Sequence, residues 1–197
     1  MKKLLLIIII PLFSTTLLFS QEKPIEKPIR IGIELGAPNV YGLNFEYVTP
    51  MLNARLAPTI DFSYFNVPQD DCATCDVDFT YLELGANYYF KKAGKGTYGH
   101  ISFGRMGLQA TDNQPLFGYA EGNGVVNLLN AKIGAKIGNT IYFRLEIGYC
   151  SVISSDVNHL EYTEFGGDPQ LIPLFTREIK LPSTGGLAFG IGFGIAL

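Results

Sequence analysis

From residue 29 onward the chain alternates between apolar residues and small or polar ones. This period of two is typical of β-strands whose two faces meet different surroundings. The clearest example lies at the C-terminal end, where Leu187, Phe189, Ile191 and Phe193 alternate with glycine and alanine. Eight such segments begin near residues 30, 41, 52, 82, 98, 129, 141 and 187. The pattern predicts an all-β chain of eight antiparallel strands.

The second face of these segments combines glycine with charged residues, and this decides which way the sheet faces. A soluble barrel turns its apolar face inward, whereas a membrane barrel turns that face toward lipid. Glycine on a water-facing strand would weaken the strand without gain, but inside a narrow barrel it makes room for long charged neighbours. We therefore predict an eight-stranded antiparallel transmembrane β-barrel whose lumen is filled by a charge network. Its expected members are Arg30, Glu34, Glu46, Arg55, Asp61, Glu83, Lys132, Lys136, Arg144 and Glu146.

The first twenty residues have the features of a signal peptide. Lys2 and Lys3 precede an apolar run from residue 4 to 10, and Ser20 is a small residue before a polar stretch. We expect residues 1–20 to be a signal peptide, 21–28 a short N-terminal periplasmic segment and 29–197 the barrel domain. Pro11 and the polar step at residues 14–16 argue against the alternative, a membrane anchor.

The connections between the segments alternate in length. Those at residues 50–51, 91–96 and 138–139 are short, whereas 66–76, 109–124 and 153–183 are longer. Known outer-membrane barrels have short periplasmic turns and long external loops. Tyrosines and phenylalanines lie near the segment ends on the apolar face, where interface girdles form; they are Tyr41, Tyr47, Tyr64, Tyr88, Phe90 and Tyr149.

Composition agrees with a surface that needs little water. Only 17% of residues are charged, against about a quarter in a soluble domain. The formal charge is −3, and losing Lys2 and Lys3 with the signal peptide would make it −3 − 2 = −5. With no basic block, the chain is not expected to bind nucleic acid.

The signal peptide, the eight alternating segments and a final segment that ends the chain resemble the small outer-membrane β-barrel domain proteins of Gram-negative bacteria, the OmpX-like and OmpA-transmembrane-domain-like barrels. The resemblance covers residues 29–197 and rests on this pattern, without a diagnostic motif. It implies the cell outer membrane as location, outer-membrane lipid as surroundings and insertion by the barrel assembly machinery. Members usually end on an aromatic residue, whereas this chain ends on Leu197. The family performs structural, adhesive and enzymatic tasks, so the fold does not choose among them.

Cys72 and Cys75 are close in an acidic loop, and in an exported protein their spacing favours a disulfide. The surrounding carboxylates do not stabilise a redox-active thiolate, and thiol or imidazole ligands for a metal are too few. Weak binding of Ca²⁺ by the neighbouring aspartates, free thiols, and pairing with another cysteine are the alternatives. Cys150 is the odd cysteine.

Two histidines invite a catalytic interpretation. His100 and Ser102 match the His-x-Ser spacing of lipid A deacylases, but the alternation turns them into the lumen, where they are expected to be a hydrogen-bonded pair. His159 lies in the last long loop near residues that could complete a hydrolytic triad; they are Ser154, Ser155, Asp156 and Glu161. The glycines at 190, 192 and 194 are followed by no helix, so they predict an inward strand face and no dinucleotide site.

Three functional hypotheses remain open. The first is a non-enzymatic barrel that contacts the exterior or a protein partner through loops 109–124 and 153–183, with no cofactor and no metal. The second is an outer-membrane lipid-modifying hydrolase that uses His159. The third is a soluble periplasmic barrel that binds a small ligand.

Overall fold

The computed structural model describes residues 26–68, 75–91, 94–114, 118–163 and 184–197, and within these strands the side chains of 67–68, 75, 112–114, 118–121 and 157–163 are not described. The described elements are β1 (Ile29–Ala37), β2 (Val40–Tyr47), α2 (Met51–Ala54), β3 (Leu56–Pro68), β4 (Cys75–Tyr89), β5 (Gly96–Gln114), β6 (Gly118–Gly138), β7 (Ile141–Thr163) and β8 (Gly186–Ala196). Among the described residues, no helix has the length and apolar character needed to cross a bilayer.

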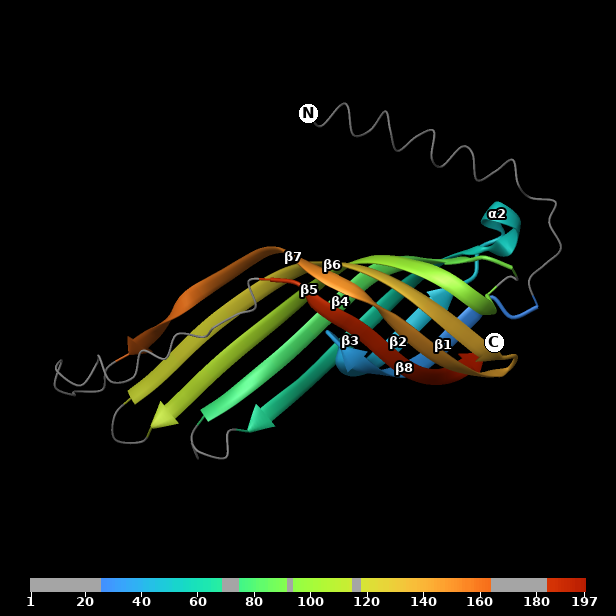
Figure 1. Cartoon of the computed structure of the whole chain (residues 1–197). Coiled ribbons are helices and arrows are strands. Elements are labelled where there is room, and N and C mark those ends of the chain that lie inside the picture. The colour runs from blue at the N-terminus through green and yellow to red at the C-terminus, as the bar shows by residue number, and fades with distance from the viewer. Residues whose placement is uncertain (1–25, 69–74, 92–93, 115–117, 164–183) are drawn as a thin grey trace, which may run out of the picture.

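The eight strands form one closed antiparallel barrel in sequence order. Each strand pairs with its neighbours along the chain, and β1 closes the barrel by pairing with β8, from Arg30 opposite Ala196 to Ala37 opposite Phe189. The predicted all-β, eight-stranded antiparallel architecture is therefore confirmed. Figure 1 shows the barrel from the side, with α2 and the C-terminus at one end.

The lower part of the barrel, the part nearest that end, is apolar outside and polar inside. Side chains along β1 alternate between exposed and buried, with Arg30 and Glu34 buried and Ile31 and Ile33 exposed. In β8, Leu187, Phe189, Ile191 and Phe193 are all exposed. This is the facing that the sequence predicts, and it is the reverse of a soluble barrel.

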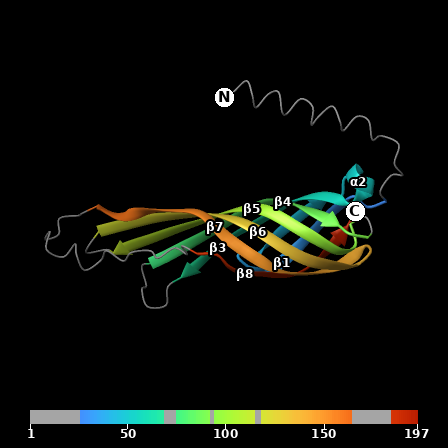
Figure 2. The same ribbon diagram turned by 45° about the horizontal axis from the view of Figure 1, so that its top comes forward.

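The wall of the barrel is uneven in height. β5, β6 and β7 contain 19, 21 and 23 residues, whereas β1 and β2 contain 9 and 8. Strands β3 to β7 therefore continue as an extension beyond the ends of β1, β2 and β8, at the end away from the C-terminus (Figures 1 and 2).

The polarity of the two faces reverses as the strands enter this extension. In β4, Glu83 is buried inside while Leu84 is exposed outside; further along, Phe79 is buried inside while Thr80 is exposed outside. Phe79, Tyr81, Val126 and Leu128 form a buried apolar cluster on the inner face. Hence the lower barrel has an apolar exterior, and the extension has the polar-out, apolar-in arrangement of a sheet in water.

This reversal corrects the predicted loops. Most of 109–124 and parts of 66–76 and 153–183 are strand: β3 reaches residue 68, β4 starts at 75, β5 ends at 114, β6 starts at 118 and β7 continues to 163. The prediction counted as strand only segments with an apolar outer face, so it missed the parts where apolar residues turn inward. Residues 69–74, 115–117 and 164–183 lie outside the described residues.

The start of the third strand is also corrected. Residues 51–54 form the short helical turn α2, and Leu52 and Asn53 have φ values of 55° and 58°. These left-handed conformations break the extended chain, so β3 begins at Leu56 and not at residue 52. The alternation at residues 52–56 is not that of a strand.

Candidate functional site

The interior of the lower barrel is filled by a network built on buried carboxylates. Glu46 on β2 is fully buried and receives charged donors from two other strands. The guanidinium of Arg30 lies 2.8 Å from Oε1 of Glu46, and the ammonium of Lys136 lies 2.7 Å from Oε2. The amide of Asn87 and the hydroxyl of Tyr89 also donate to this carboxylate, at 2.5 and 2.9 Å. Charged donors at these distances offset the cost of removing the carboxylate from water.

Lys136 is surrounded by aromatic rings as well as by its carboxylate. Its ammonium lies 4.8 Å from the ring centroid of Tyr142, 5.6 Å from that of Tyr98 and 5.8 Å from that of Tyr89. All three distances are within the range of cation–π attraction, which replaces part of the lost hydration.

Glu83 on β4 is the second centre of the network. Oε1 of Glu83 lies 2.8 Å from Nε2 of His100 and accepts from the hydroxyl of Ser102 at 2.6 Å. Oε2 accepts from Tyr81 at 2.5 Å and from Asn130 at 2.9 Å. Both oxygens are therefore saturated by donors from β4, β5 and β6.

Two further groups join these centres into one network. Lys132 bridges two carboxylates, at 3.3 Å from Glu83 and 3.1 Å from Glu146. Asn87 bridges the other pair, since its amide nitrogen donates to Glu46 while its oxygen lies 2.7 Å from Nδ1 of His100. Contacts therefore run without a break from Arg30 on β1 to Glu146 on β7.

Arg144 extends the network toward β1 and β3. Its guanidinium pairs with Glu34, lies 3.4 Å from Asp61 and lies 3.7 Å from Glu146. Asp61 also accepts from the amide of Asn44 at 2.7 Å.

Strand β8 contributes space to this interior. Its inward positions are Ala188, Gly190, Gly192, Gly194 and Ala196. A Cβ on Gly192 would lie 2.7 Å from the carbonyl oxygen of Ile33, and one on Gly194 would lie 2.5 Å from the hydroxyl of Tyr142. The lack of side chains at these positions is what lets Arg144, Glu34 and Tyr142 occupy the interior.

Apolar and aromatic layers lie on both sides of the charged network. At the end with the short turns, Val48, Ala57, Tyr89 and Tyr98 form a buried cluster. At the other end lies the cluster of the extension, to which Phe65, Met106, Leu108 and Val152 add partly buried side chains. The charged network lies between these two clusters, and each of its charged side chains is buried.

The structure brings together every predicted member of the charge network except Arg55. Arg55 follows α2, before β3 begins, and is half-buried. Its side chain forms no ion pair with any residue that the structure describes. Because the third strand starts later than predicted, Arg55 lies at the rim of the barrel and not on its wall.

The sequence reasoning missed the neutral members of the network. Asn87, Asn130, Tyr81 and Tyr98 were not assigned to it, although each has the parity of the inward-facing residues of its strand. That parity is the signal that could have found them.

The candidate catalytic residues are not arranged for catalysis where the structure describes them. His100 and Ser102 both bind Glu83 and are buried in the lumen, as the alternation predicts. His159 is in the upper part of β7, where side chains are not described, and Ser154 accepts a hydrogen bond from Asn127 at 2.9 Å. Cys72 lies outside the described residues, so the disulfide with Cys75 stays a prediction. Within the described part of the chain, no group of three or more His, Cys, Asp or Glu residues could hold a metal ion.

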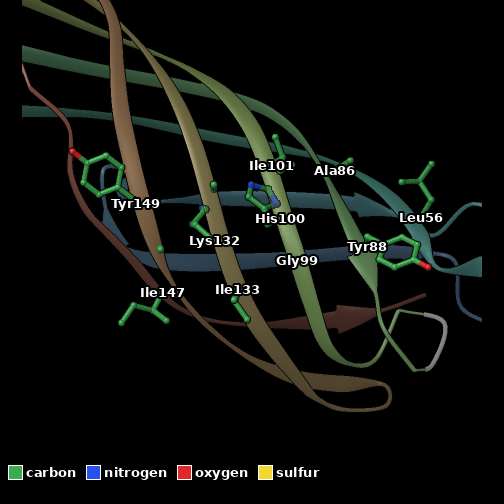
Figure 3. Close-up of a pocket in the computed structure, with 12 residues that line it drawn as sticks. Leu56, Ala86, Tyr88, Gly99, His100, Ile101, Lys132, Ile133, Ile147 and Tyr149 are labelled. Carbon is green, nitrogen blue, oxygen red and sulfur yellow. The ribbon is translucent and has the colours of Figure 1, made fainter.

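A hollow lies on the outer surface of the barrel, mainly across strands β4 to β7 (Figure 3). It has a volume of about 640 Å³, and its floor is formed by the small residues Ala86, Gly99, Ala131 and Gly148. Leu56 and Tyr88 lie at one end and Ile147 and Tyr149 at the other (Figure 3).

The chain was compared with protein families, curated proteins and solved structures. No protein-family model and no curated protein matches the sequence. A solved structure that is similar is the crystal structure of CarO from Acinetobacter baumannii, with 12% sequence identity, a TM-score of 0.45, and coverage of 89% of this chain and 100% of that chain. At this level of similarity, the function of the present chain has to be argued from its own residues.

Proposed function

We propose that the protein is an exported, non-enzymatic outer-membrane barrel that presents its extension to the exterior of the cell. The observation that carries this proposal is the reversal of polarity along the same strands. Leu82, Leu84 and Tyr88 face outward on the lower part of β4, whereas Asp78 and Thr80 face outward on its upper part. A sheet that crosses from lipid into water requires such a change of face.

The height of the apolar outer surface agrees with a bilayer. On β7 the apolar outer residues run from Ile141 to Tyr149, and on β6 from Leu129 to Ile137. These stretches match the roughly 9–11 residues that a tilted strand needs to cross a bilayer. Aromatic side chains are exposed near both ends of the band, where the sequence predicts an interface girdle; they are Tyr41, Tyr47, Tyr64, Tyr88, Phe90 and Tyr149.

The packed interior supports a role without transport. Eight strands leave an interior just wide enough to be filled by side chains, and here charged and aromatic groups fill it. A soluble ligand-binding barrel would need an apolar cavity inside and charge outside, and the lower barrel has neither.

The same proposal carries the remaining expectations. Residues 1–20 act as a signal peptide, the barrel assembly machinery inserts the OmpX-like domain, and outer-membrane lipid surrounds the lower barrel. The connections between β5 and β6 and between β7 and β8 contact the exterior or a protein partner. The extension of β3 to β7 adds strand surface next to these connections.

Membrane fractionation combined with heat-modifiable gel migration tests the proposal. We expect the protein in the outer-membrane fraction after a carbonate wash, with an unheated band that migrates differently from the boiled one. A protein that is removed by carbonate, or that appears in the soluble periplasm, would overturn it.

A further inference from the structure

The hollow on the outer surface of β4 to β7 fits a ligand that comes from the membrane. We propose that it is a binding site for one anionic phospholipid of the periplasmic leaflet, with an acyl chain lying over Gly99 and the phosphate near Lys91. This inference rests on the proposed insertion of the barrel into the outer membrane.

The hollow forms because small residues lie among large apolar side chains on the outer surface of the barrel. Gly99 on β5 pairs with Tyr88 on β4 and with Ile133 on β6. In the adjacent row, Ala86 and Ala131 flank Ile101. A Cβ on Gly99 would meet only the ring of Phe90, at 3.5 Å, so the space above this residue is open.

The hollow is closed toward the lumen. His100 and Lys132 lie beneath it (Figure 3), but both side chains are buried and bound within the interior network. Its accessible lining is therefore apolar, and its volume of about 640 Å³ lies within the range of about 300–1,000 Å³ that is usual for ligand sites. On a surface that faces lipid, the apolar ligand at hand is an acyl chain.

One end of the hollow reaches the rim of the barrel that carries the short turns. Tyr88 lines this end, and its ring makes an edge contact with Phe90, with ring centroids 6.1 Å apart. Lys91 follows Phe90 directly and is exposed. Its long side chain can lie along the apolar rim and place its ammonium at the level of the lipid phosphates.

The charge of this rim points to an anionic headgroup. Besides Lys91, the described part of the rim carries Lys27, Arg55 and Lys95, and Glu26 is the acidic residue there. Lys95 donates to Asn139 at 2.6 Å, whereas neither Lys91 nor Arg55 forms an ion pair with a described residue. Arg55 directly precedes Leu56, which also lines the hollow. A phosphodiester would supply a negatively charged partner for Lys91 and Arg55.

The test is native mass spectrometry of the folded, detergent-purified barrel titrated with dioleoylphosphatidylglycerol. The wild type is expected to retain one lipid. In the variant Gly99→Leu/Ala131→Leu, leucine side chains fill the hollow, and we expect the affinity to fall about tenfold, equal to about 1.4 kcal/mol. Ala135→Leu is the matched control, since Ala135 is on the same strand and face as Ala131 but outside the hollow; it should bind as the wild type does.

The headgroup is tested separately with Lys91→Gln. This variant should lower the affinity for phosphatidylglycerol about fivefold and that for phosphatidylethanolamine by less, because the ammonium of the second headgroup already neutralises its phosphate. Equal binding by the wild type and the filled variant would overturn the lipid site, and so would a protein dimer that the filled variant abolishes without any change in lipid retention. The same preparations are checked by gel migration and fractionation. A folded, membrane-inserted barrel that retains no lipid refutes this inference alone, whereas a barrel absent from the membrane refutes the proposed function as well.

Discussion

Oε1 of Glu83 lies 2.8 Å from Nε2 of His100, at the meeting point of donors from three strands. Both residues are almost completely buried, and neither has access to the lipid or to the open end of the barrel. Through Asn87 and Lys132, the pair joins the part of the network around Glu46 on β2 to the part around Glu146 on β7.

Replacing Glu83 by glutamine should therefore destabilise the barrel strongly. The change leaves Lys132 paired with Glu146 alone. It also points the NH₂ group of the new glutamine at side chains that are themselves hydrogen-bond donors. Removing one partner of a buried pair costs about 3–5 kcal/mol. Urea unfolding in lipid vesicles, followed by the loss of the heat-modifiable band, measures the difference; the chain contains no tryptophan to serve as a fluorescence probe.

Asp78→Asn is the matched control for that experiment. Asp78 is also a carboxylate on β4, but it accepts hydrogen bonds at 3.2 Å from Tyr64 and Asn66 on the outer face of the extension. Interactions of this exposed kind are worth at most about 1 kcal/mol. Equal losses of stability in the two variants would show that the buried network has no special role.

The strands of the lower barrel and their facing could be predicted because one physical rule holds throughout them. The outer side chains are apolar, as the proposed contact with lipid requires, and closure of the barrel puts the alternate residues inside. The charged members of the network follow from the same rule, as Glu46 and Lys136 show. Arg55 was misplaced because parity alone cannot reveal the left-handed residues of α2, which end the alternation before β3 begins.

The extension was missed for a different reason. There the apolar residues move to the inner face, so Phe79 and Val126 interrupt the pattern that defines the lower barrel. The individual partners inside the lumen were not predictable either. Which donor meets Glu83 depends on the stagger between strands, and the stagger is set by pairing along the whole sheet.

The glycines of β8 should be intolerant of larger side chains where they face the lumen. In Gly194→Val the new Cβ would lie 2.5 Å from the Tyr142 hydroxyl and 2.7 Å from the Cα of Gly32. Because the second contact is with backbone, we expect a loss of about 1–3 kcal/mol from overpacking. Gly186→Val is the control on the same strand, since nothing lies within 4 Å of its Cβ position. The two variants are compared by the fraction of protein that migrates as folded barrel.

The boundary between lipid and water can be located with arginine substitutions on one strand. Leu84 and Thr80 both face outward on β4, on opposite sides of the change in polarity. Leu84→Arg should reduce the free energy of folding into vesicles by about 2–4 kcal/mol, whereas Thr80→Arg should change it by less than about 1 kcal/mol. If Thr80→Arg were as harmful as Leu84→Arg, the extension would have to lie within the membrane.

The packed interior predicts that the barrel conducts no solutes. Vesicles that contain the protein should swell in isotonic arabinose no faster than empty vesicles, with a general porin as positive control. The two apolar layers, one around Tyr89 and Tyr98 and the other around Phe79 and Leu128, are the physical reason. Swelling above the level of empty vesicles would contradict a lumen closed by side chains.

The predicted disulfide between Cys72 and Cys75 can be tested against the third cysteine of the chain. Cys150 is a free thiol, half-buried, whose sulfur donates to the carbonyl oxygen of Gly186 at 3.4 Å. If Cys72 and Cys75 are paired, alkylation of the denatured protein without reductant adds one label, and alkylation after reduction adds labels to all three cysteines. Mass spectrometry of the intact chain counts the labels directly. Three labels before reduction would mean that both loop cysteines are free, and the stiffening of that part of the extension would then depend on the β3–β4 pairing alone.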